Sequence, residues 1–296
     1  MSEYIYIDGR FYRAGKARIS VKDRGFLYGD GVFETMRSYS GSVLMLSSHL
    51  NRLFHSLKVL KFYPAFSRSC IEDAVLKTLV KNRLTRKDAY IKIMVTRGDH
   101  SGVLHFNSGS RPRVIIIAKK LISYNGAIYS EGVDIISSSI MRHASGDQTH
   151  KHKLMSYFDN LYEKDRAHSQ GAFESIFLTR DKLILEGSTT NIFMVKHSRV
   201  YTPALTQNIL PGITRRVVLD LCRGNHICVW EKKLHYRDLI NADEVFLTNS
   251  IAEVIPVRKI DAYRLGSRVP GKTTAKLMSL LRDLKKFTKE KAGVNI

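Results

Sequence analysis

The chain has 296 residues, of which 44% are hydrophobic and 25% are charged, as in an ordinary folded globular protein. This length is long for a single hydrophobic core, so we expect two domains. The sequence has no run of eighteen apolar residues, which argues against a membrane-spanning helix. The N-terminus lacks the basic and apolar regions of a secretory signal, and we therefore expect a cytoplasmic protein.

The chain is strongly basic, with 48 Lys and Arg against 27 Asp and Glu, a net charge of +21. The basic residues are spread along the sequence, and the densest run, residues 282–291, also contains acidic residues. We interpret this charge as a solvated surface that attracts anionic substrates, and we expect no nucleic-acid partner. A non-enzymatic polyanion-binding protein is the remote alternative. The three cysteines lack the spacing of metal ligands, so we expect no metal site.

The first third of the sequence is typical of short strands combined with two helices. Asp8-Gly9 between two apolar runs predicts a β-hairpin. Apolar residues spaced i, i+3, i+4, i+7 from Leu50 to Leu60 predict a helix that begins after Ser47 or Ser48 as N-cap. The other expected elements are strands over 32–39, 43–46, 90–96 and 114–118 and a helix over 70–82.

The pattern loosens around residues 119–132, and we place the domain boundary there. The expected division is a small α/β domain over 1–120, a linker over 121–132 and a larger domain over 133–296. A polar connection over 142–152 is expected to precede a helix over 153–169. The remaining expected elements are strands over 133–140, 175–178, 183–185, 191–196, 200–202 and 245–248, a helix after Gly212 and a helix over 273–289.

Two segments carry the clearest chemical signal. Glu186 ends a predicted strand beside a tight Gly-Ser turn, and Pro211-Gly212 leads into a helix that begins near Ile213. Free N–H groups at a helix start bind anions, and a glycine there lets a phosphate approach the main chain. A carboxylate and a phosphate cradle indicate a flat, phosphorylated, nitrogen-containing cofactor. Pyridoxal 5'-phosphate (PLP) has that form.

An enzyme using this cofactor needs one lysine to hold it as a Schiff base and to carry protons at the substrate Cα. Lysine suits both tasks because its pKa falls readily when it is desolvated or close to positive charge. Lys153, at the start of a predicted helix, is the candidate, and Lys151 is its rival.

The chain resembles the fold-type-IV PLP enzymes, the class IV aminotransferase family, over nearly its whole length. This family includes branched-chain and D-amino-acid transaminases and 4-amino-4-deoxychorismate lyases. The resemblance implies a two-domain α/β (α+β type) fold with a barrel-like sheet in the larger domain. It also implies a homodimer, with an active site between the domains that the neighbouring subunit completes. The resemblance rests on residues 24–35, 49–53, 186–193, 209–215 and 244–256 and on the segment around Lys153.

The resemblance implies a role for each matching residue. Lys153 becomes the Schiff-base lysine because the family's Ala and Gly then recur at Ala167 and Gly171; choosing Lys151 shifts this register by two. Glu186 is implied to hydrogen-bond the pyridinium nitrogen and keep it protonated.

The resemblance also implies the groups that bind the phosphate. Arg52 is implied to pair with it, although a solvated arginine on a helix face is the alternative. The backbone N–H groups of Ile213 and Thr214, with the Thr214 hydroxyl, are implied to complete the cradle at Gly212. The further implied cofactor contacts are Asn249 and Ser250 at the phosphate and Tyr157 near the phenolic oxygen.

The choice of reaction within the family depends on fewer residues. Lyases typically carry threonine at the position of Thr35, beside Phe33, whereas branched-chain transaminases usually carry glycine there. Transaminases are the larger group, and Glu186-Gly-Ser188 is at least as common among them. The D-amino-acid carboxylate trap is missing from 102–104. Arg97 is either a substrate-carboxylate ligand or structural.

We therefore predict a transaminase, of branched-chain type, that transfers the amino group of an amino acid to the 2-oxo acid 2-oxoglutarate. Phe33, Thr35 and Arg97 are the candidate substrate residues. Aminodeoxychorismate lyase is the alternative.

Overall fold

The computed structural model describes residues 3–99, 102, 105–106, 111–144, 149–266 and 268–293, without the side chains of 287–293. The chain divides into two compact units. The first comprises Met1–Ile122, His152–Tyr157 and Lys285–Ile296, and the second comprises Ser123–Lys151 and Phe158–Leu284. The division therefore differs from the linear one expected from the sequence, because the segment around Lys153 belongs to the first unit and residues 123–132 belong to the second.

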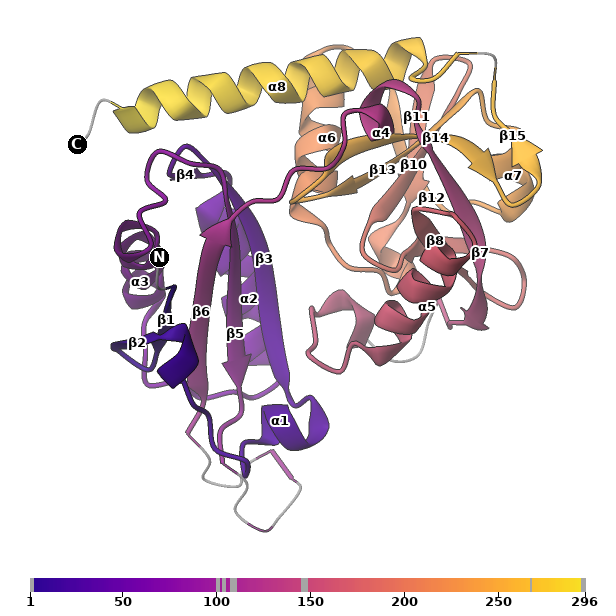
Figure 1. Ribbon diagram of the computed structural model, residues 1–296. Helices are drawn as coiled ribbons and strands as arrows, with labels where there is room; N and C mark the ends of the chain where they lie inside the picture. The colour runs from indigo at the N-terminus through magenta and orange to yellow at the C-terminus, as the bar shows by residue number, and fades with distance from the viewer. Residues whose placement is uncertain are drawn as a thin grey trace. The chain divides into compact units, whose positions relative to one another are not determined.

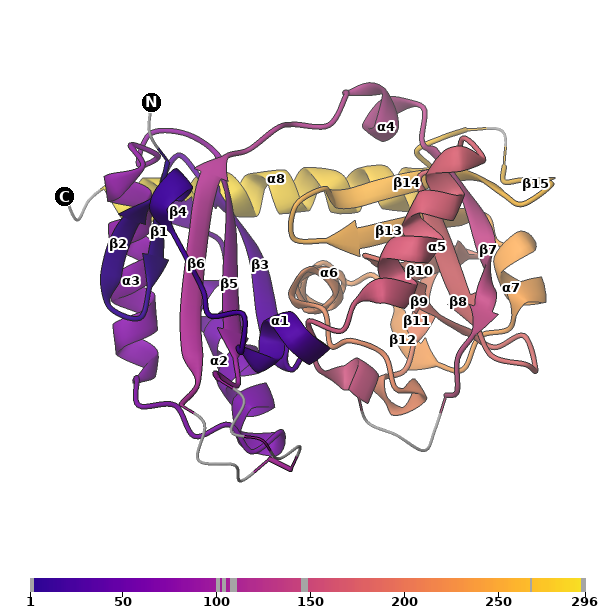
Figure 2. The ribbon, with the colours of Figure 1, turned by 60° about the horizontal axis from the view of Figure 1, so that its bottom comes forward.

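The first unit is built on a six-stranded antiparallel sheet with the order β2-β1-β6-β5-β3-β4. Two helices, α2 (Leu46–Val59) and α3 (Arg68–Lys81), cover one face of this sheet (Figures 1 and 2). The strands are β1 (Tyr4–Ile7), β2 (Arg10–Arg13), β3 (Gly31–Tyr39), β4 (Ser42–Val43), β5 (Ala89–Thr96) and β6 (Arg113–Lys120). Shorter helical segments are η1 (Ala14–Lys16) and α1 (Arg24–Tyr28).

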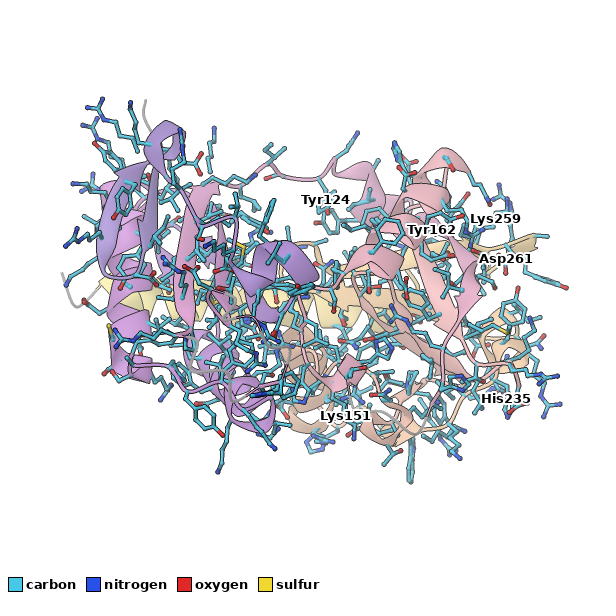
Figure 3. All side chains as sticks on the ribbon, turned by 90° about the horizontal axis from the view of Figure 1, so that it is seen from below. Tyr124, Lys151, Tyr162, His235, Lys259 and Asp261 are labelled. Carbon is cyan, nitrogen blue, oxygen red and sulfur yellow. The ribbon has the colours of Figure 1, made fainter. Side chains whose placement is uncertain are left out.

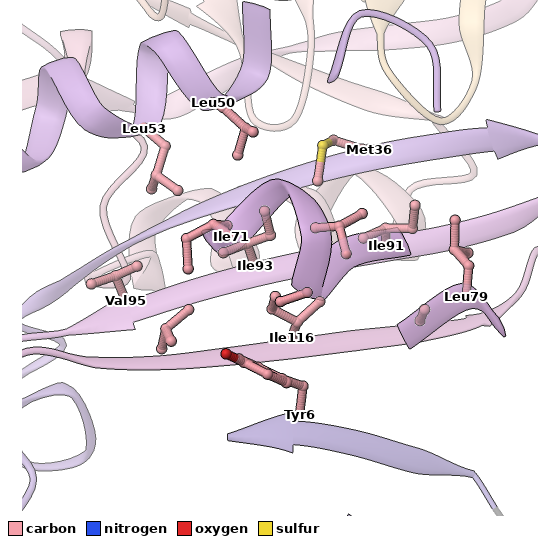
Figure 4. Packing of buried hydrophobic residues seen from close by; sticks show 14 of the residues in the cluster. Tyr6, Met36, Leu50, Leu53, Ile71, Leu79, Ile91, Ile93, Val95 and Ile116 are labelled. Carbon is pink, nitrogen blue, oxygen red and sulfur yellow. The ribbon is translucent and has the colours of Figure 1, made fainter. Parts of the chain in front are cut away.

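The hydrophobic core of the first unit lies between this sheet and α2 and α3 (Figure 4). Leu50 and Leu53 from α2 and Ile71 from α3 are almost fully buried against the strands. Along β5, residues from Ala89 to Val95 alternate between fully buried and half-buried, so every second side chain points into the core. The intervening residues of β3 and β5 therefore lie on the face away from the helices.

The start of α2 differs from the prediction. The helix begins at Leu46, and its N-cap is Met45 in the left-handed region with φ 55°, without a side-chain cap. The expected caps Ser47 and Ser48 lie inside the first turn. Helix α3 is capped conventionally, because the Ser67 hydroxyl accepts a hydrogen bond from the Cys70 N–H at 3.2 Å.

The second unit contains a nine-stranded mixed sheet with the order β12-β11-β10-β13-β14-β7-β8-β9, and β15 pairs with β14. The sheet curls into a half-barrel (Figure 1), which confirms the predicted barrel-like sheet. The strands are β7 (Val133–Met141), β8 (Glu174–Leu178), β9 (Ile184–Gly187), β10 (Asn191–Lys196), β11 (Arg199–Pro203), β12 (Val229–Lys232), β13 (Glu244–Asn249), β14 (Glu253–Ile260) and β15 (Tyr263–Arg264).

The helices of the second unit include α5, which spans Phe158–Ser169. The prediction that this helix starts at Lys153 is wrong by five residues, because residues 153–155 pair with β3 instead. The other helices are α4 (Ala127–Ser130), η2 (Thr149–Lys151), η3 (Leu205–Gln207), α6 (Ile213–Gly224), α7 (Tyr236–Ile240) and α8 (Lys272–Gly293), whose residues from Lys285 belong to the first unit.

Asp261, the residue that follows β14, links this strand to β7 and α7 through a cluster of hydrogen bonds. The Asp261 carboxylate (Figure 3) accepts hydrogen bonds from the Ser137 N–H at 2.8 Å, the Ser137 hydroxyl at 2.7 Å and the Tyr236 hydroxyl at 2.6 Å. These bonds tie β7 and α7 to the end of β14.

Throughout the described ranges, no helix has both the length and the apolar character needed to cross a bilayer.

Candidate active site

Lys153 lies on an extended segment that is bound to the edge of β3. The Phe33 N–H donates to the Lys153 carbonyl at 2.8 Å, and the Met155 N–H donates to the Gly31 carbonyl at 2.8 Å. His152, just before the lysine, is buried and lies 2.9 Å from the Ser56 hydroxyl on α2 through Nδ1. These contacts fix the backbone of Lys153 within the first unit.

The side chain of Lys153 lies among aromatic rings. Its Nζ is 4.5 Å from the centroid of the Phe33 ring and 5.5 Å from that of Tyr157. The two rings meet edge to face, with centroids 5.4 Å apart and an interplanar angle of 89°. The structure therefore brings together three predicted site residues: Lys153, Phe33 and Tyr157.

Arg52 belongs to a buried network centred on Glu34. Its Nε and Nη2 donate to the two Glu34 carboxylate oxygens at 2.7 Å each, and His49 Nδ1 lies 2.8 Å from the same carboxylate. Burial alone would raise the pKa of Glu34, but Arg52 and the hydrogen bonds outweigh it and lower this pKa to about 2. Burial lowers the pKa of His49, and Arg52 and Lys153 lower it further against the opposing effect of Glu34.

The face of the sheet away from α2 and α3 carries Phe33 and Thr35. Thr35 lies opposite Lys92 of β5 in the strand register. The Lys92 Nζ is 4.7 Å from the Phe33 ring centroid, and burial lowers the pKa of Lys92. Lys92 is not among the residues predicted from the sequence, although a lysine inside the apolar run of β5 is conspicuous there.

Arg97 is held inside the fold of the first unit. Its Nε donates to both carboxylate oxygens of Asp30, at 2.9 and 3.1 Å. Its two terminal nitrogens donate to the carbonyls of Lys61 and Leu60 at 3.1 Å each, and Arg97 is only 3% exposed. These contacts favour the structural role for Arg97, because a substrate carboxylate would have to displace them.

Glu186 occupies the end of β9 in the second unit and is buried. Its Oε2 accepts hydrogen bonds from the Leu210 N–H at 3.0 Å and the Asn191 amide at 3.4 Å, and Arg142 lies 3.8 Å from Oε1. Because Asn191 also donates to the Leu210 carbonyl at 3.0 Å, the carboxylate is tied directly to the loop that precedes α6.

The start of α6 has the properties expected of an anion cradle. Gly212 is its N-cap, no side chain caps the helix, and Gly212, Ile213 and Thr214 are partly exposed. A Cβ at Gly212 would lie 1.9 Å from Asn191 Oδ1, so a larger residue at this position would force the Asn191 side chain to move. Asn249 ends β13 and accepts hydrogen bonds from its own turn, from the N–H groups of residues 251 and 252 at 3.0 and 2.7 Å.

The candidate residues thus form two sets, each held within its own unit. Lys153, Arg52, Tyr157, Phe33 and Thr35 belong to the first unit. Glu186, residues 212–214, Asn249 and Ser250 belong to the second. The functional groups fit those that PLP binding uses: the first unit offers a primary amine and a guanidinium, and the second offers an uncapped helix start and a buried carboxylate. Among the described residues, no three His, Cys, Asp or Glu are grouped as metal ligands.

Parts of two sequence-based predictions fall outside the described residues. They are residues 103 and 104 of the missing carboxylate trap and residues 145–148 of the polar connection before Lys153.

Comparison with known proteins agrees with the resemblance seen in the sequence. The family model for amino-transferase class IV matches residues 31–260. A Methanocaldococcus jannaschii protein, named provisionally as a branched-chain-amino-acid aminotransferase, is 36% identical over 95% of this chain and 96% of its own. The D-alanine aminotransferase of Bacillus licheniformis is 33% identical, covering 94% and 96% of the two chains. The aminodeoxychorismate lyase of Bacillus subtilis is 30% identical, covering 98% and 97%.

Solved structures give the same result. The Escherichia coli branched-chain amino acid aminotransferase superposes with a TM-score of 0.90 at 30% identity, covering 96% of this chain and 95% of that one. The branched-chain aminotransferase of the archaeon Thermoproteus uzoniensis, solved with norvaline, gives a TM-score of 0.88 at 27% identity, covering 98% and 97%. The chain therefore belongs to the class IV aminotransferase family, and it is an enzyme of the PLP-dependent fold-type-IV group of aminotransferases and lyases.

Proposed function

We propose that this enzyme is a PLP-dependent transaminase that moves the amino group of a branched-chain amino acid to 2-oxoglutarate. The observation that carries the proposal is the placement of Lys153, whose backbone is fixed on β3 and whose amine lies 4.5 Å from the Phe33 ring centroid. The strand pairing and the two rings therefore hold this amine at one position, from which it can meet the cofactor aldehyde in a fixed orientation. The similarity to branched-chain aminotransferases supports the choice of substrate.

In this proposal, specific side chains and backbone N–H groups bind the cofactor and carry the proton. PLP supplies an aldehyde that holds the substrate nitrogen and a protonated ring that withdraws electrons from the substrate Cα. Lys153 would hold the cofactor covalently until the substrate amine displaces it, and its freed amine would then accept the proton from the substrate Cα. Glu186 keeps the proton on the ring nitrogen. Arg52 and the N–H groups of Ile213 and Thr214 bind the phosphate.

Asn249, Ser250 and Tyr157 remain proposed cofactor contacts. Phe33 and Thr35 are proposed to border the substrate, since both lie on one face of the sheet and the Phe33 ring centroid is 4.5 Å from Lys153 Nζ.

A specific observation keeps the aminodeoxychorismate lyase as second candidate. Thr35 lies opposite Lys92 in the strand register, so its hydroxyl is on the same face of the sheet as Phe33. In a lyase this hydroxyl would assist the departure of pyruvate from the substrate. The 30% identity to the Bacillus subtilis lyase supports this candidate too.

The lysine assignment can be tested without any substrate. The purified protein with PLP should absorb near the visible edge, and borohydride should trap the cofactor on Lys153, as located by peptide mass spectrometry. Lys153→Ala should lose the absorbance and the adduct. Lys151 (Figure 3), two residues earlier, is the matched control, and Lys151→Ala should keep both. An adduct on Lys151 would contradict the assignment.

The two reactions are separated by their products. Glutamate formed from 2-oxoglutarate with leucine, isoleucine or valine supports the transaminase. Pyruvate released from aminodeoxychorismate, with no glutamate formed from any of the three donors, supports the lyase and refutes the primary proposal.

We also propose that the enzyme is a homodimer. Helix α1 exposes three consecutive large apolar side chains, Phe26, Leu27 and Tyr28, which are 65%, 44% and 51% exposed. Contiguous exposed apolar side chains are typical of interaction surfaces. Phe26→Asp should therefore yield monomers in light scattering, whereas the same change at Trp230, an isolated exposed aromatic on β12, should not. A monomeric wild-type protein would refute this proposal.

A further inference from the structure

A second carboxylate of the second unit, Glu174, is fully buried and is not assigned to any chemical step. It begins β8, which pairs with β9, the strand that ends at Glu186 and Gly187. Glu174 Oε1 accepts hydrogen bonds from the Ser175 N–H at 2.9 Å and from the Ser188 hydroxyl. One oxygen of this carboxylate therefore already contacts the turn that follows Glu186.

The other carboxylate oxygen of Glu174 binds the rest of the same turn. Oε2 accepts from the Thr189 N–H at 3.1 Å, the Thr189 hydroxyl at 2.7 Å and the Thr190 hydroxyl at 3.3 Å. Residues 188, 189 and 190 of the turn thus all donate to one buried carboxylate. Side-chain atoms also pack tightly here, because a Cβ on Gly187 would lie 2.1 Å from Thr190 Oγ1 and 3.0 Å from Glu174 Cγ.

We propose that Glu174 is a positioning residue that fixes the turn over residues 187–190 and thereby the direction of the Glu186 carboxylate. The proposal rests on the proposed function, in which Glu186 holds the proton on the ring nitrogen of PLP. The turn itself is closed by the Gly187 N–H, which donates to the Thr190 carbonyl at 2.7 Å. Because Gly187 directly follows Glu186, a movement of this turn would also change the backbone at Glu186 and the direction of its side chain.

The site requires a carboxylate and not merely a polar group of the same size. Each oxygen of Glu174 accepts a backbone N–H, one from Ser175 and one from Thr189. A glutamine offers one oxygen and one NH2, so in either orientation one of these N–H groups would face another donor. A buried donor without an acceptor is costly, and the turn would move to relieve it.

The charge of Glu174 is compensated by Lys164 of α5, whose Nζ lies 3.8 Å from Oε2. Lys164 also donates to the Phe173 carbonyl, and its Nζ is 4.1 Å from the centroid of the Phe173 ring. The ammonium group is therefore held in place by contacts other than the turn. This arrangement places a cation beside the buried carboxylate while the carboxylate oxygens remain directed at residues 188–190.

Glu163 provides a matched control. It is equally buried, and its carboxylate accepts from Ser139 N–H at 3.0 Å, Arg166 Nε at 3.0 Å and the Ser175 hydroxyl at 2.6 Å. These three partners all lie outside residues 187–190. Glu163→Gln therefore removes a buried charge from the same region without removing a direct contact of residues 187–190, and its one link to the turn is Ser175, whose carbonyl accepts the Ser188 N–H at 2.9 Å.

The experiment compares Glu174→Gln and Glu163→Gln with wild type in two measurements. Hydrogen exchange in the absence of cofactor should become at least about tenfold faster at the Ser175 or the Thr189 amide in Glu174→Gln, and at neither amide in Glu163→Gln. In the PLP-loaded enzymes, Glu174→Gln should lower kcat about tenfold with a smaller change in KM and should alter the absorbance of the bound cofactor. Glu163→Gln should leave both the spectrum and kcat within about twofold of wild type.

The outcomes are distinguishable from those that test the proposed function. A wild-type protein that never takes up PLP refutes the proposed function. The exchange measurement then still tests whether Glu174 fixes the turn over residues 187–190. Normal PLP uptake by wild type, together with equal effects of the two variants on exchange, kcat and spectrum, overturns the role of Glu174. Global unfolding of Glu174→Gln is recognised by its melting curve, and Thr189→Ala, which removes one hydroxyl contact, then repeats the comparison. A wild-type spectrum and kcat in that variant also overturn the proposal.

Discussion

Replacing Glu34 with glutamine should destabilise the first unit strongly at neutral pH. The Glu34 carboxylate is 1% exposed and receives two hydrogen bonds from Arg52 at 2.7 Å and one contact from His49 at 2.8 Å. Its pKa of about 2, against an ordinary value of 4.5, corresponds to about 3 kcal/mol of stabilisation by the charged form. Breaking a buried ion pair on one side costs roughly the same amount.

The assay is reversible urea unfolding at 25 °C, measured from pH 7 down to pH 2. Because the folded-state pKa of Glu34 is depressed, its contribution is present above pH 4.5 and is lost as the pH falls toward 2. The free energy of unfolding of the wild-type protein should therefore exceed that of Glu34→Gln by about 3 kcal/mol at pH 7. This difference should narrow between pH 4.5 and 2.

The control for this prediction is the ion pair of Arg37 and Asp88, 2.8 Å apart, which also involves β3. The Asp88 side chain is 33% exposed, so Asp88→Asn should cost less than about 1 kcal/mol. The reasoning would be refuted if the two variants were equally stable at pH 7. It would also be refuted if the deficit of Glu34→Gln persisted unchanged at pH 2.

Three further predictions concern the candidate site. Gly212→Ala, whose Cβ would lie 1.9 Å from Asn191 Oδ1, should weaken PLP binding about tenfold in an absorbance titration. Gly224 lies at the other end of α6, and a Cβ there would have no atom within 4 Å, so Gly224→Ala should leave PLP binding unchanged. Equal effects of the two changes would contradict the proposed phosphate cradle at Gly212. Lys92→Met should raise the KM for 2-oxoglutarate about tenfold without lowering the melting temperature, since it removes a partly buried cation; an unchanged KM would exclude a substrate role. Thr35→Gly should abolish pyruvate release by a lyase but largely spare transamination, so its effect on the two product assays identifies the reaction.

Most of the secondary structure could be predicted because the periodicity of apolar residues is local information. The hairpin at Asp8-Gly9 and helix α6 after Gly212 appear where the sequence places them. Strand β14 was not predicted, because Pro256 interrupts its pattern and a proline is uncommon inside a paired strand. The start of α5 was misplaced for a different reason. The residues before Phe158 are compatible with a helix, but pairing with β3 outweighs that local preference.

The roles of individual arginines could not be predicted from the sequence. Arg52 and Arg97 both stand beside apolar residues, and either could bind an anion. Arg97 donates hydrogen bonds to Asp30 and to the carbonyls of Lys61 and Leu60, which directly follow α2 and lie 36 and 37 residues away in the chain. Arg52 is paired with Glu34, 18 residues away. Such long-range partners leave no local pattern, so only the folded chain separates the two cases.

The segment His152–Tyr157, which carries the candidate lysine, is bound to the first unit although its neighbours in the sequence belong to the second. In the sequence, this segment is continuous with η2 before it and α5 after it, both of which belong to the second unit. Its own hydrogen bonds run to Gly31, Phe33 and Ser56 of the first unit. Lys153 is therefore held by the same strand and helix that carry Glu34 and Arg52. Changes in β3 or α2 should thus perturb the lysine more than equally conservative changes in α5, although α5 begins only five residues after it.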